Sequence, residues 1–577
     1  MNKLAKHLKG FELETVLGPF FKLAEAALDL AVPIVVADII DNGISAGDTN
    51  YIMRKCLLLG LLALIGLAFS VTAQYFCAKA AVGFTGSLRH TLFSHIQGLS
   101  FSELDGIGVS TMITRMTSDM NQVQSGLNLA LRLLLRSPFI VFGAMIMACR
   151  IDASSAKIFG SAIIALLVVV FAIMLGCIPL YRRSQSRLDD LLLSTRENLV
   201  GARVLRAFCR EEDETARFDE KNSVLTSVQL FAGRISALLN PVTYALINLA
   251  IIWLIHFGAL RVDGGALTQG SVVALYNYMS QILVELIKLA NLIIQITRAL
   301  ACGKRIQSVL ETESSMHSPD ELPALDKNAP VVELRDASLR YGSAGGEALS
   351  GITLTARRGE TVGIIGGTGA GKTSLISLIP RFYDVCGGEV LVEGADVRSW
   401  PLDELRQRVA VVPQHASLFC GTIRDNMLMG REDATDDDIM RALETAQATD
   451  VVAAKPEGLD YVIEQGAHNL SGGQRQRLTI ARALLHGGDV LILDDSASAL
   501  DFATDARLRR AVRSIEGMTV FIVSQRAASV MGADKIAVLD DGRIVGLGTH
   551  DELLGSCDVY REICQSQFKQ EEAEAVK

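Results

Sequence analysis

The sequence lacks an excess of basic residues, and its cysteines form no Cys-X-X-Cys pair. Its 577 residues carry a formal net charge of −9. No basic surplus is therefore available to neutralise phosphates, which argues against a nucleic-acid-binding protein. The ten cysteines also lack regular spacing. This argues against a disulfide framework or a zinc site and predicts that most cysteines are reduced core residues.

Charged residues are missing from long stretches of the first half of the chain. Residues 56–78 and 158–181 contain none, residues 235–260 contain no Asp, Glu, Lys or Arg, and each stretch exceeds the ~20 residues that cross a bilayer as a helix. Three weaker candidates cover about 16–40, 127–149 and 269–294. Six spans are predicted. The N-terminus has no small-residue cleavage site, so we expect its apolar run to be a retained span and not a signal peptide.

The length and composition predict at least two domains. Single cores stop growing near roughly 250–300 residues, and the mean hydropathy of +0.32 comes mainly from the first half.

Lys and Arg are absent from the loop DNGISAGDTN at 41–50 but frequent between 182 and 234. Because basic residues favour the cytoplasmic side, both termini and a C-terminal soluble domain are predicted to be cytoplasmic, at the inner (plasma) membrane. Helical apolar spacing predicts that the spans continue through 79–127 and 182–234.

The weaker spans contain charges at helical spacing. Lys22, Glu25 and Asp29 share one face of the first span, and they fit either a structural cluster between helices or a translocation path. A polar stripe in the last span either faces the bundle interior or, from Lys288 onward, lies beyond the membrane; it comprises Asn277, Gln281, Glu285, Lys288, Asn291, Gln295 and Arg298. The role of Arg132 and Arg136 in the third span stays open.

A polar, proline-containing stretch divides the chain. SSMHSPDELPALDKNAP begins at residue 314 and is typical of a linker. Beyond it, short apolar strands alternate with helical segments, which predicts an α/β domain. The predicted domains are a membrane domain at 1–312, a linker at 313–329 and an α/β domain at 330–577.

A glycine-rich loop lies between an apolar strand and a helix in the second domain. GGTGAGKT occupies residues 366–373. Its glycines allow backbone N–H groups to surround a phosphate, Lys372 reaches the outer phosphates, and the Thr373 hydroxyl can bind Mg²⁺. The residues predicted to bind the nucleotide here are Gly366, Gly367, Thr368, Gly369, Ala370, Gly371, Lys372, Thr373 and Ser374.

Two further motifs accompany this loop. VLILDD at 490–495 is a buried strand that ends in Asp494, placed to hold Mg²⁺ through water, and LSGGQ begins at Leu470. In this order the three motifs resemble the nucleotide-binding domain of ATP-binding cassette (ABC) transporters. Six spans with two long cytoplasmic excursions, ahead of the cassette, resemble an exporter-type half-transporter. This resemblance implies helices at the tips of the two excursions, near 108–118 and 203–213, that transmit closure of the cassettes.

The resemblance implies roles for further residues. Tyr341 matches the aromatic residue that stacks on adenine, Gln414 the glutamine that senses magnesium, and Asp501 the loop that crosses between two cassettes. In this family two cassettes enclose two ATP molecules, each between one phosphate loop and the other chain's signature. The signature residues here are Ser471, Gly472, Gly473 and Gln474. A chain with one cassette is thus expected to pair.

Two positions depart from the family pattern. Asp495 stands where the family has the catalytic glutamate, and Gln525 stands where it has the switch-loop histidine. Aspartate withdraws the carboxylate by roughly 1.5 Å, and glutamine cannot relay a proton as imidazole can. The resemblance therefore predicts one subunit of a heterodimeric exporter of multidrug, lipid or peptide-like cargo. This subunit binds ATP and Mg²⁺ at its own degenerate site, hydrolyses ATP slowly, and supplies LSGGQ to a competent partner site. A homodimeric exporter with a slow Asp495 site and a non-pumping ATP-gated regulator are the alternatives.

Overall fold

The computed structural model describes residues 4, 6–326, 328–342, 345–496 and 498–575. They form two compact units. The helical unit comprises Met1–His95 and Ser110–Glu311, and the α/β unit comprises Ile96–Val109 and Thr312–Lys577. The domain limits predicted from the sequence stay predictions.

Very long helices build the helical unit. α3 has 49 residues and α8 has 48; at 1.5 Å per residue each extends over about 72 Å, more than twice the ~30 Å hydrocarbon thickness. The prediction that spans continue beyond the membrane is therefore confirmed. The helices are α2 (Glu12–Asp38), α3 (Thr49–Gln97), α5 (Val109–Thr114), α6 (Met120–Leu133), α7 (Arg136–Ile151), α8 (Ala153–Val200), α9 (Ala202–Ala207), α10 (Glu211–Ala237), α11 (Leu239–Asp263) and α12 (Gln269–Leu310).

Five continuous helical stretches among the described residues are long and apolar enough to cross a membrane: Thr49–Gln97, Val109–Ile151, Ala153–Val200, Glu211–Asp263 and Gln269–Leu310. They contain five of the six predicted spans. The remaining span lies in α2, a helix of 27 residues that is long enough to cross. Lys22, Glu25 and Asp29 interrupt its apolar stretch, so α2 does not qualify by composition.

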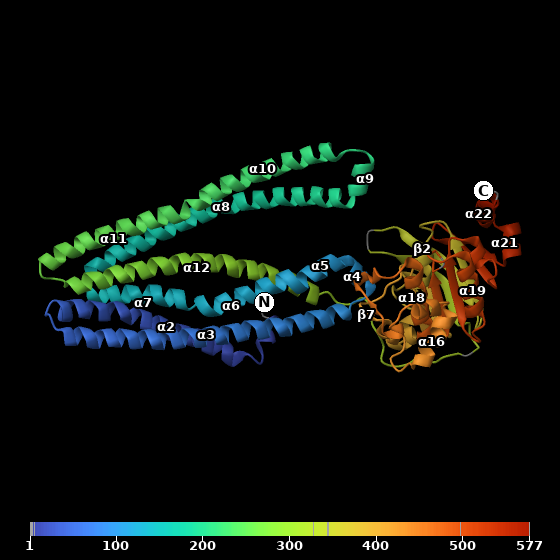
Figure 1. Cartoon of the computed structure of the whole chain (residues 1–577), viewed down its shortest axis with the longest axis horizontal. Coiled ribbons are helices and arrows are strands. Elements are labelled where there is room, and N and C mark those ends of the chain that lie inside the picture. Colours follow the sequence, from blue (N-terminus) through green and yellow to red (C-terminus); the bar gives the residue numbers. More distant parts are fainter. Residues whose placement is uncertain (1–3, 5, 327, 343–344, 497, 576–577) are drawn as a thin grey trace. The chain divides into compact units, whose positions relative to one another are not determined.

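Within the helical unit, α8, α10 and α11 form one extended hairpin (Figure 1). α12 packs along α2, α6 and α7. The buried core of this unit is built from residues of α2, α7, α8, α11 and α12 and includes Tyr278, whose hydroxyl donates a hydrogen bond of 2.6 Å to the backbone oxygen of Leu30. This bond joins α12 to α2.

The tip of the first long excursion belongs to the α/β unit. It is α4 (Phe101–Ile107), which begins after Ser100 and ends at Gly108, where φ is +79°. The prediction of a tip helix at 108–118 was therefore wrong, because the break at Gly108 starts the returning helix there. Phe101 packs on Phe382 with ring centroids 4.7 Å apart, and the Tyr383 hydroxyl donates a 2.6 Å hydrogen bond to Asp105. The second tip helix is α9, close to its predicted place.

Two larger sheets and a two-stranded ribbon form the α/β unit. The six-stranded sheet has the order β12-β11-β3-β10-β9-β6, with only β12 antiparallel. Its strands are β3 (Thr361–Gly366), β6 (Val409–Val412), β9 (Val490–Asp494), β10 (Thr519–Ser524), β11 (Lys535–Asp540) and β12 (Arg543–Gly548). β3, β9 and β10 are buried along their whole length, as expected for central parallel strands. Their carboxyl ends therefore meet at one edge.

The four-stranded antiparallel sheet has the order β2-β1-β4-β5. Its strands are β1 (Val332–Arg340), β2 (Glu347–Ala356), β4 (Gly387–Val392) and β5 (Ala395–Asp396), and the ribbon pairs β7 (Gly421–Thr422) with β8 (Val462–Ile463). The helices of this unit besides α4 are α13 (Lys372–Ser377), α14 (Leu402–Arg408), α15 (Ile423–Leu428), α16 (Asp436–Thr445), α17 (Thr449–Ala453), α18 (Gly472–His486), α19 (Phe502–Arg513), α20 (Ala527–Val530), α21 (His550–Ser556) and α22 (Asp558–Ala575).

All ten cysteines are free thiols. Cys77, Cys177, Cys302, Cys557 and Cys564 are buried, and the other five are exposed. The prediction that most cysteines are core residues is therefore met for half of them only.

Candidate functional site

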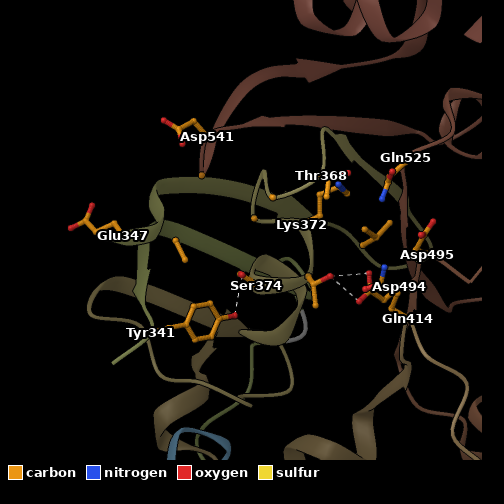
Figure 2. Close-up of a pocket in the computed structure, with 16 residues that line it drawn as sticks. Tyr341, Glu347, Thr368, Lys372, Ser374, Gln414, Asp494, Asp495, Gln525 and Asp541 are labelled. Atoms are coloured by element: carbon orange, nitrogen blue, oxygen red, sulfur yellow. Dashed lines mark hydrogen bonds between the residues drawn. The ribbon is translucent and has the colours of Figure 1, made fainter. Parts of the chain in front are cut away.

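A pocket of about 410 Å³ opens at the carboxyl edge of β3, β9 and β10. Of the residues predicted to bind or turn over nucleotide, those that line it are Tyr341, Thr368, Gly369, Gly371, Lys372, Thr373, Ser374, Gln414, Asp494, Asp495 and Gln525. Figure 2 shows Asp495, Gln525 and Asp494 on one side of the pocket and Tyr341 on the other. Parallel strands end here together, so motifs more than 100 residues apart meet in one place.

The glycine-rich loop encloses the ammonium group of Lys372. Lys372 Nζ donates hydrogen bonds of 2.9 and 2.7 Å to the backbone oxygens of Gly366 and Gly367. Gly369 and Gly371 have φ of +85° and +97°, which side-chain-bearing residues rarely adopt. Burial lowers the pKa of Lys372, and the charges of Asp495 and Asp494 oppose that shift. The loop thus holds a buried cation where a phosphate would lie.

Asp494 and Thr373 meet at the base of the pocket. Asp494 ends β9 and is only 4% exposed, and Thr373 Oγ1 donates hydrogen bonds of 3.3 and 3.0 Å to its two carboxylate oxygens. Burial raises the pKa of Asp494, the Thr373 hydrogen bond opposes this, and the neighbouring Asp495 adds to it. A hydroxyl and a carboxylate that converge in this way, with the Gln414 side chain in the same pocket, are oxygen ligands that suit Mg²⁺.

Asp495 is the next residue after Asp494, and both its backbone N–H and its backbone oxygen form hydrogen bonds. Its N–H donates a 3.0 Å hydrogen bond to the backbone oxygen of Val523, and its own oxygen accepts from Ser498 N and Oγ at 3.2 and 2.9 Å. Its φ is +43°, in the left-handed region. Burial raises its pKa, while Lys372 and Arg526 lower it. The position of this carboxylate is therefore set by side-chain length and not by backbone adjustment.

The loop that carries Gln525 is held by the C-terminal helix. Gln567 Nε2 donates a 2.8 Å hydrogen bond to the backbone oxygen of Gln525, and Gln567 Oε1 accepts one of 2.8 Å from Ala527 N. The Gln525 side chain itself is exposed and lines the pocket. One glutamine of α22 thus fixes the backbone on both sides of Arg526.

Tyr341 stands at the opposite wall. Its hydroxyl donates a 3.0 Å hydrogen bond to Ser374 Oγ, and its ring meets Tyr383 edge to face with centroids 5.0 Å apart. Because the side chain is 42% exposed, one ring face remains accessible to a flat ligand.

The signature residues do not line this pocket in the described part of the chain. Ser471 caps α18 by accepting a 3.3 Å hydrogen bond from Gln474 N, while the Gln474 side chain accepts one of 2.9 Å from Ser471 N. Asp501 likewise caps α19 through Thr504 N at 2.9 Å. Gly366, Gly367 and Ala370 are not among the described residues that line the pocket; their backbone oxygens accept hydrogen bonds from Lys372 or, for Ala370, from Gly542 N. Ser471 and Gly472 are exposed.

Sequence reasoning missed the wall made by β2 and the β11–β12 turn. Glu347, Ala348, Asp541 and Gly542 also line the pocket, and Gly542 N donates a 3.2 Å hydrogen bond to Ala370 O. The Asp-Gly pair at 541–542 is a recognisable hairpin signal. Its place beside the glycine-rich loop, however, follows only from the pairing of β11 with β3.

Comparison with known proteins agrees with this arrangement. Residues 15–286 match the family model for the ABC transporter transmembrane region, and residues 349–498 match that for ABC transporters. An uncharacterized ABC transporter ATP-binding protein of Mycobacterium tuberculosis is 36% identical over 98% of this chain and 97% of its own length. The ABC transporter YfiB of Bacillus subtilis is 34% identical over the whole of both chains. An ATP-dependent lipid A-core flippase of Syntrophus aciditrophicus is 32% identical over 84% of this chain and 80% of its own.

A solved structure of a bacterial Atm1-family ABC exporter with ATP bound has the same fold. It superposes with a TM-score of 0.79, covers 98% of both chains and shares 23% of residues. The helical unit, the cassette and their order all match. The chain is therefore a multi-pass membrane protein that belongs to the ABC transporter family, with the transmembrane region and the ATP-binding domain in one chain and the fold of an ABC exporter.

Proposed function

We propose that this chain is one subunit of a heterodimeric exporter, in which it binds ATP at a degenerate site and completes a competent site on its partner. The observation that carries this proposal is Asp495, an aspartate whose backbone is fixed in the pocket by Val523 and Ser498. The missing methylene, roughly 1.5 Å of reach, cannot be recovered by a backbone shift. Misplacement on this scale costs ~10²-fold in rate.

Gln525 weakens the same site. Its side chain lines the pocket beside Asp495, and it can donate a hydrogen bond to a γ-phosphate, but it cannot become cationic or pass on a proton. Both departures affect turnover and neither affects the groups that hold ATP. We therefore expect Lys372, Thr373 and the glycine-rich loop to bind ATP with Mg²⁺ held by Thr373, Asp494 and Gln414, and Tyr341 to stack on adenine.

The signature supports an asymmetric dimer. Ser471 to Gln474 are intact, and the exposed Ser471 and Gly472 can serve a second chain. In a homodimer both sites would carry the same slow Asp495, whereas in a heterodimer these residues complete a site whose glutamate and histidine belong to the partner. Each ATP that binds better to the closed dimer favours closure by its differential affinity, even without hydrolysis.

We further propose that the exporter lies in the inner (plasma) membrane with both cassettes in the cytoplasm, and that its cargo is amphipathic. Basic residues between 182 and 234 favour that orientation. The similarity to a lipid A-core flippase makes a lipid-like cargo the first to test.

The decisive experiment measures ATP hydrolysis by the full chain alone and with its co-expressed partner half-transporter. Asp495→Asn in this chain is compared with Glu→Gln at the equivalent position of the partner. The proposal expects only the partner's substitution to abolish turnover. Brisk hydrolysis by this chain alone, stopped by Asp495→Asn, would replace the heterodimer with a homodimeric pump.

A further inference from the structure

A second pocket, of about 440 Å³, lies inside the helical unit between α2, α7 and α12. Four of its lining residues are charged: Asp29, Arg136, Glu285 and Lys288. Asp29 is nine residues from the end of α2 at Asp38, about 14 Å along the helix axis, which places it deep within the span. Ionisable groups at such depth are costly and face an interior or a cavity.

The two more buried charged side chains, Arg136 and Glu285, form hydrogen bonds with protein groups. Arg136 Nη1 donates a 2.8 Å hydrogen bond to Glu285, and Nη2 donates one of 3.0 Å to Asp29 Oδ2. Glu285 also accepts from Ser137 at 2.7 Å and from Lys288 at 2.9 Å. The side chains of Arg136 and Glu285 are only 12% and 5% exposed. This pair joins α7 to α12, and its role is structural.

The two more exposed charged side chains, Asp29 and Lys288, are accessible from the pocket. The side chains of Asp29 and Lys288 are each 45% exposed, and they carry opposite signs. The hydrogen bond from Arg136 reaches only Oδ2 of Asp29. An ammonium has three N–H donors, and Glu285 accepts one from Lys288. The pocket therefore presents an acceptor on α2 and a donor on α12.

Gln281 adds a buried acceptor next to Asp29. Its Nε2 donates a 3.3 Å hydrogen bond to the backbone oxygen of Asp29. That oxygen can only accept, so the amide cannot be flipped. Gln281 Oε1 is buried and has no hydrogen-bond partner within the described part of the structure. A buried acceptor without a donor is costly, so a donor from a ligand would be stabilised here.

We propose that this pocket binds the headgroup of a zwitterionic amphiphile, with its ammonium at Asp29 and Gln281 and its anionic group at Lys288. The two acidic and two basic lining residues sum to zero charge, so a ligand with one net charge would leave one charge unpaired at low dielectric. Val32, Val36 and Val284 in the same lining provide apolar contacts for a chain. This inference deepens the proposed export function by naming its substrate class.

The test measures binding to the purified full-length chain in an uncharged maltoside detergent by calorimetry. The probes are lysophosphatidylethanolamine, the anionic lysophosphatidylglycerol with the same acyl chain, and a long-chain primary alkylamine. Free phosphoethanolamine tests whether the acyl chain is needed. The wild type is expected to bind lysophosphatidylethanolamine about tenfold tighter than either singly charged probe. If phosphoethanolamine binds equally tightly, the ligand is a soluble zwitterion and the amphiphile is excluded.

Two substitutions should shift the preference in opposite directions. Asp29→Asn leaves Lys288 in excess and is expected to favour lysophosphatidylglycerol, whereas Lys288→Gln leaves Asp29 in excess and is expected to favour the alkylamine. Asp38→Asn is the matched control, because it removes a carboxylate of the same helix that pairs with Lys55 outside the pocket. Its selectivity should equal that of the wild type.

A purely structural cluster would behave differently. It would lower the affinity for all probes in parallel or leave it unchanged, and either result overturns the proposal. If Asp29→Asn does not fold, Lys288→Gln alone decides, since Glu285 keeps its hydrogen bonds from Arg136 and Ser137 when Lys288 is replaced. The assay contains no nucleotide, so its outcome is independent of whether the Asp495 site hydrolyses ATP.

Discussion

If the proposed function holds, Asp495→Glu should speed ATP hydrolysis at this chain's own site. The substitution adds one methylene to a residue whose N–H is bonded to Val523 O and whose oxygen accepts from Ser498. With the backbone fixed, the carboxylate advances into the pocket by roughly 1.5 Å. If misplacement of ~1 Å costs ~10²-fold, restoring it should lower the barrier by about 2.7 kcal/mol. The expected gain in kcat is thus of order 10²-fold.

The assay is phosphate release by the full chain reconstituted in lipid vesicles, at saturating ATP with Mg²⁺. Two copies of this chain would complete each other's sites through their own Ser471–Gln474 signatures. Asp495→Asn serves as the matched control and should leave hydrolysis as slow as in the wild type or slower, with ATP binding unchanged. Adding Gln525→His to Asp495→Glu should raise the rate further, though not multiplicatively, because both residues act on one reaction. A wild-type rate already at tens per second, or no gain from Asp495→Glu, would refute the reasoning.

Three further predictions concern Lys372, Ser471 and Gln567. Lys372→Ala should weaken ATP binding about 10- to 100-fold, because a buried charged donor is lost; equilibrium binding of a fluorescent ATP analogue measures this, with Lys535→Ala outside the pocket as the control. Ser471→Ala should remove the α18 cap at a cost of about 1 kcal/mol and slow the heterodimer without weakening ATP binding to this chain's own loop. Ser471→Thr should retain turnover, and an unimpaired Ser471→Ala heterodimer would exclude the signature role. Gln567→Leu removes the hydrogen bonds to Gln525 O and Ala527 N, so amide exchange at 525–528 should accelerate about tenfold by mass spectrometry. Gln567→Glu keeps the acceptor for Ala527 N and should show a smaller effect; equal exchange in all three proteins would argue against the clamp.

Local motifs predicted the chemistry of the nucleotide pocket because its groups follow buried strands. Thr373 and Gln525 follow β3 and β10, and Asp494 is the last residue of β9. These three strands are parallel neighbours in one sheet, so their ends bring the three residues together. The Gly542 turn and Gln567 were not predictable. The Gly542 turn reaches the site because β11 pairs with β3, and Gln567 reaches it from the last helix. No local sequence pattern predicts such contacts.

The membrane domain likewise has features that the sequence predicts and features that it does not. Hydropathy located the long spans, since a run without charges needs no partner to be recognised. The charges in α2 had two readings because their meaning depends on Arg136, 107 residues away from Asp29, and Glu285, 149 away from Arg136. In the structure these charged side chains differ in exposure. Lys22 and Glu25 pair with each other at 8% and 14% side-chain exposure, whereas the Asp29 side chain is 45% exposed and lines a pocket.

An intact glycine-rich loop can occur beside an aspartate that is a poor catalyst, because the loop and Asp495 would contact different atoms of the substrates. Under the proposed function, Lys372 and Thr373 would hold phosphate and Mg²⁺ in the ground state, whereas Asp495 and Gln525 would act on water and the γ-phosphate during the reaction. An interaction made only in the transition state changes kcat without changing the affinity for ATP. Loss of reach at Asp495 therefore leaves the binding energy of ATP intact. In the proposed dimer that energy would still favour the closed state by the difference in affinity between the two states. A heterodimer can thus combine one site that holds ATP and keeps the cassettes together with one that hydrolyses ATP and releases them.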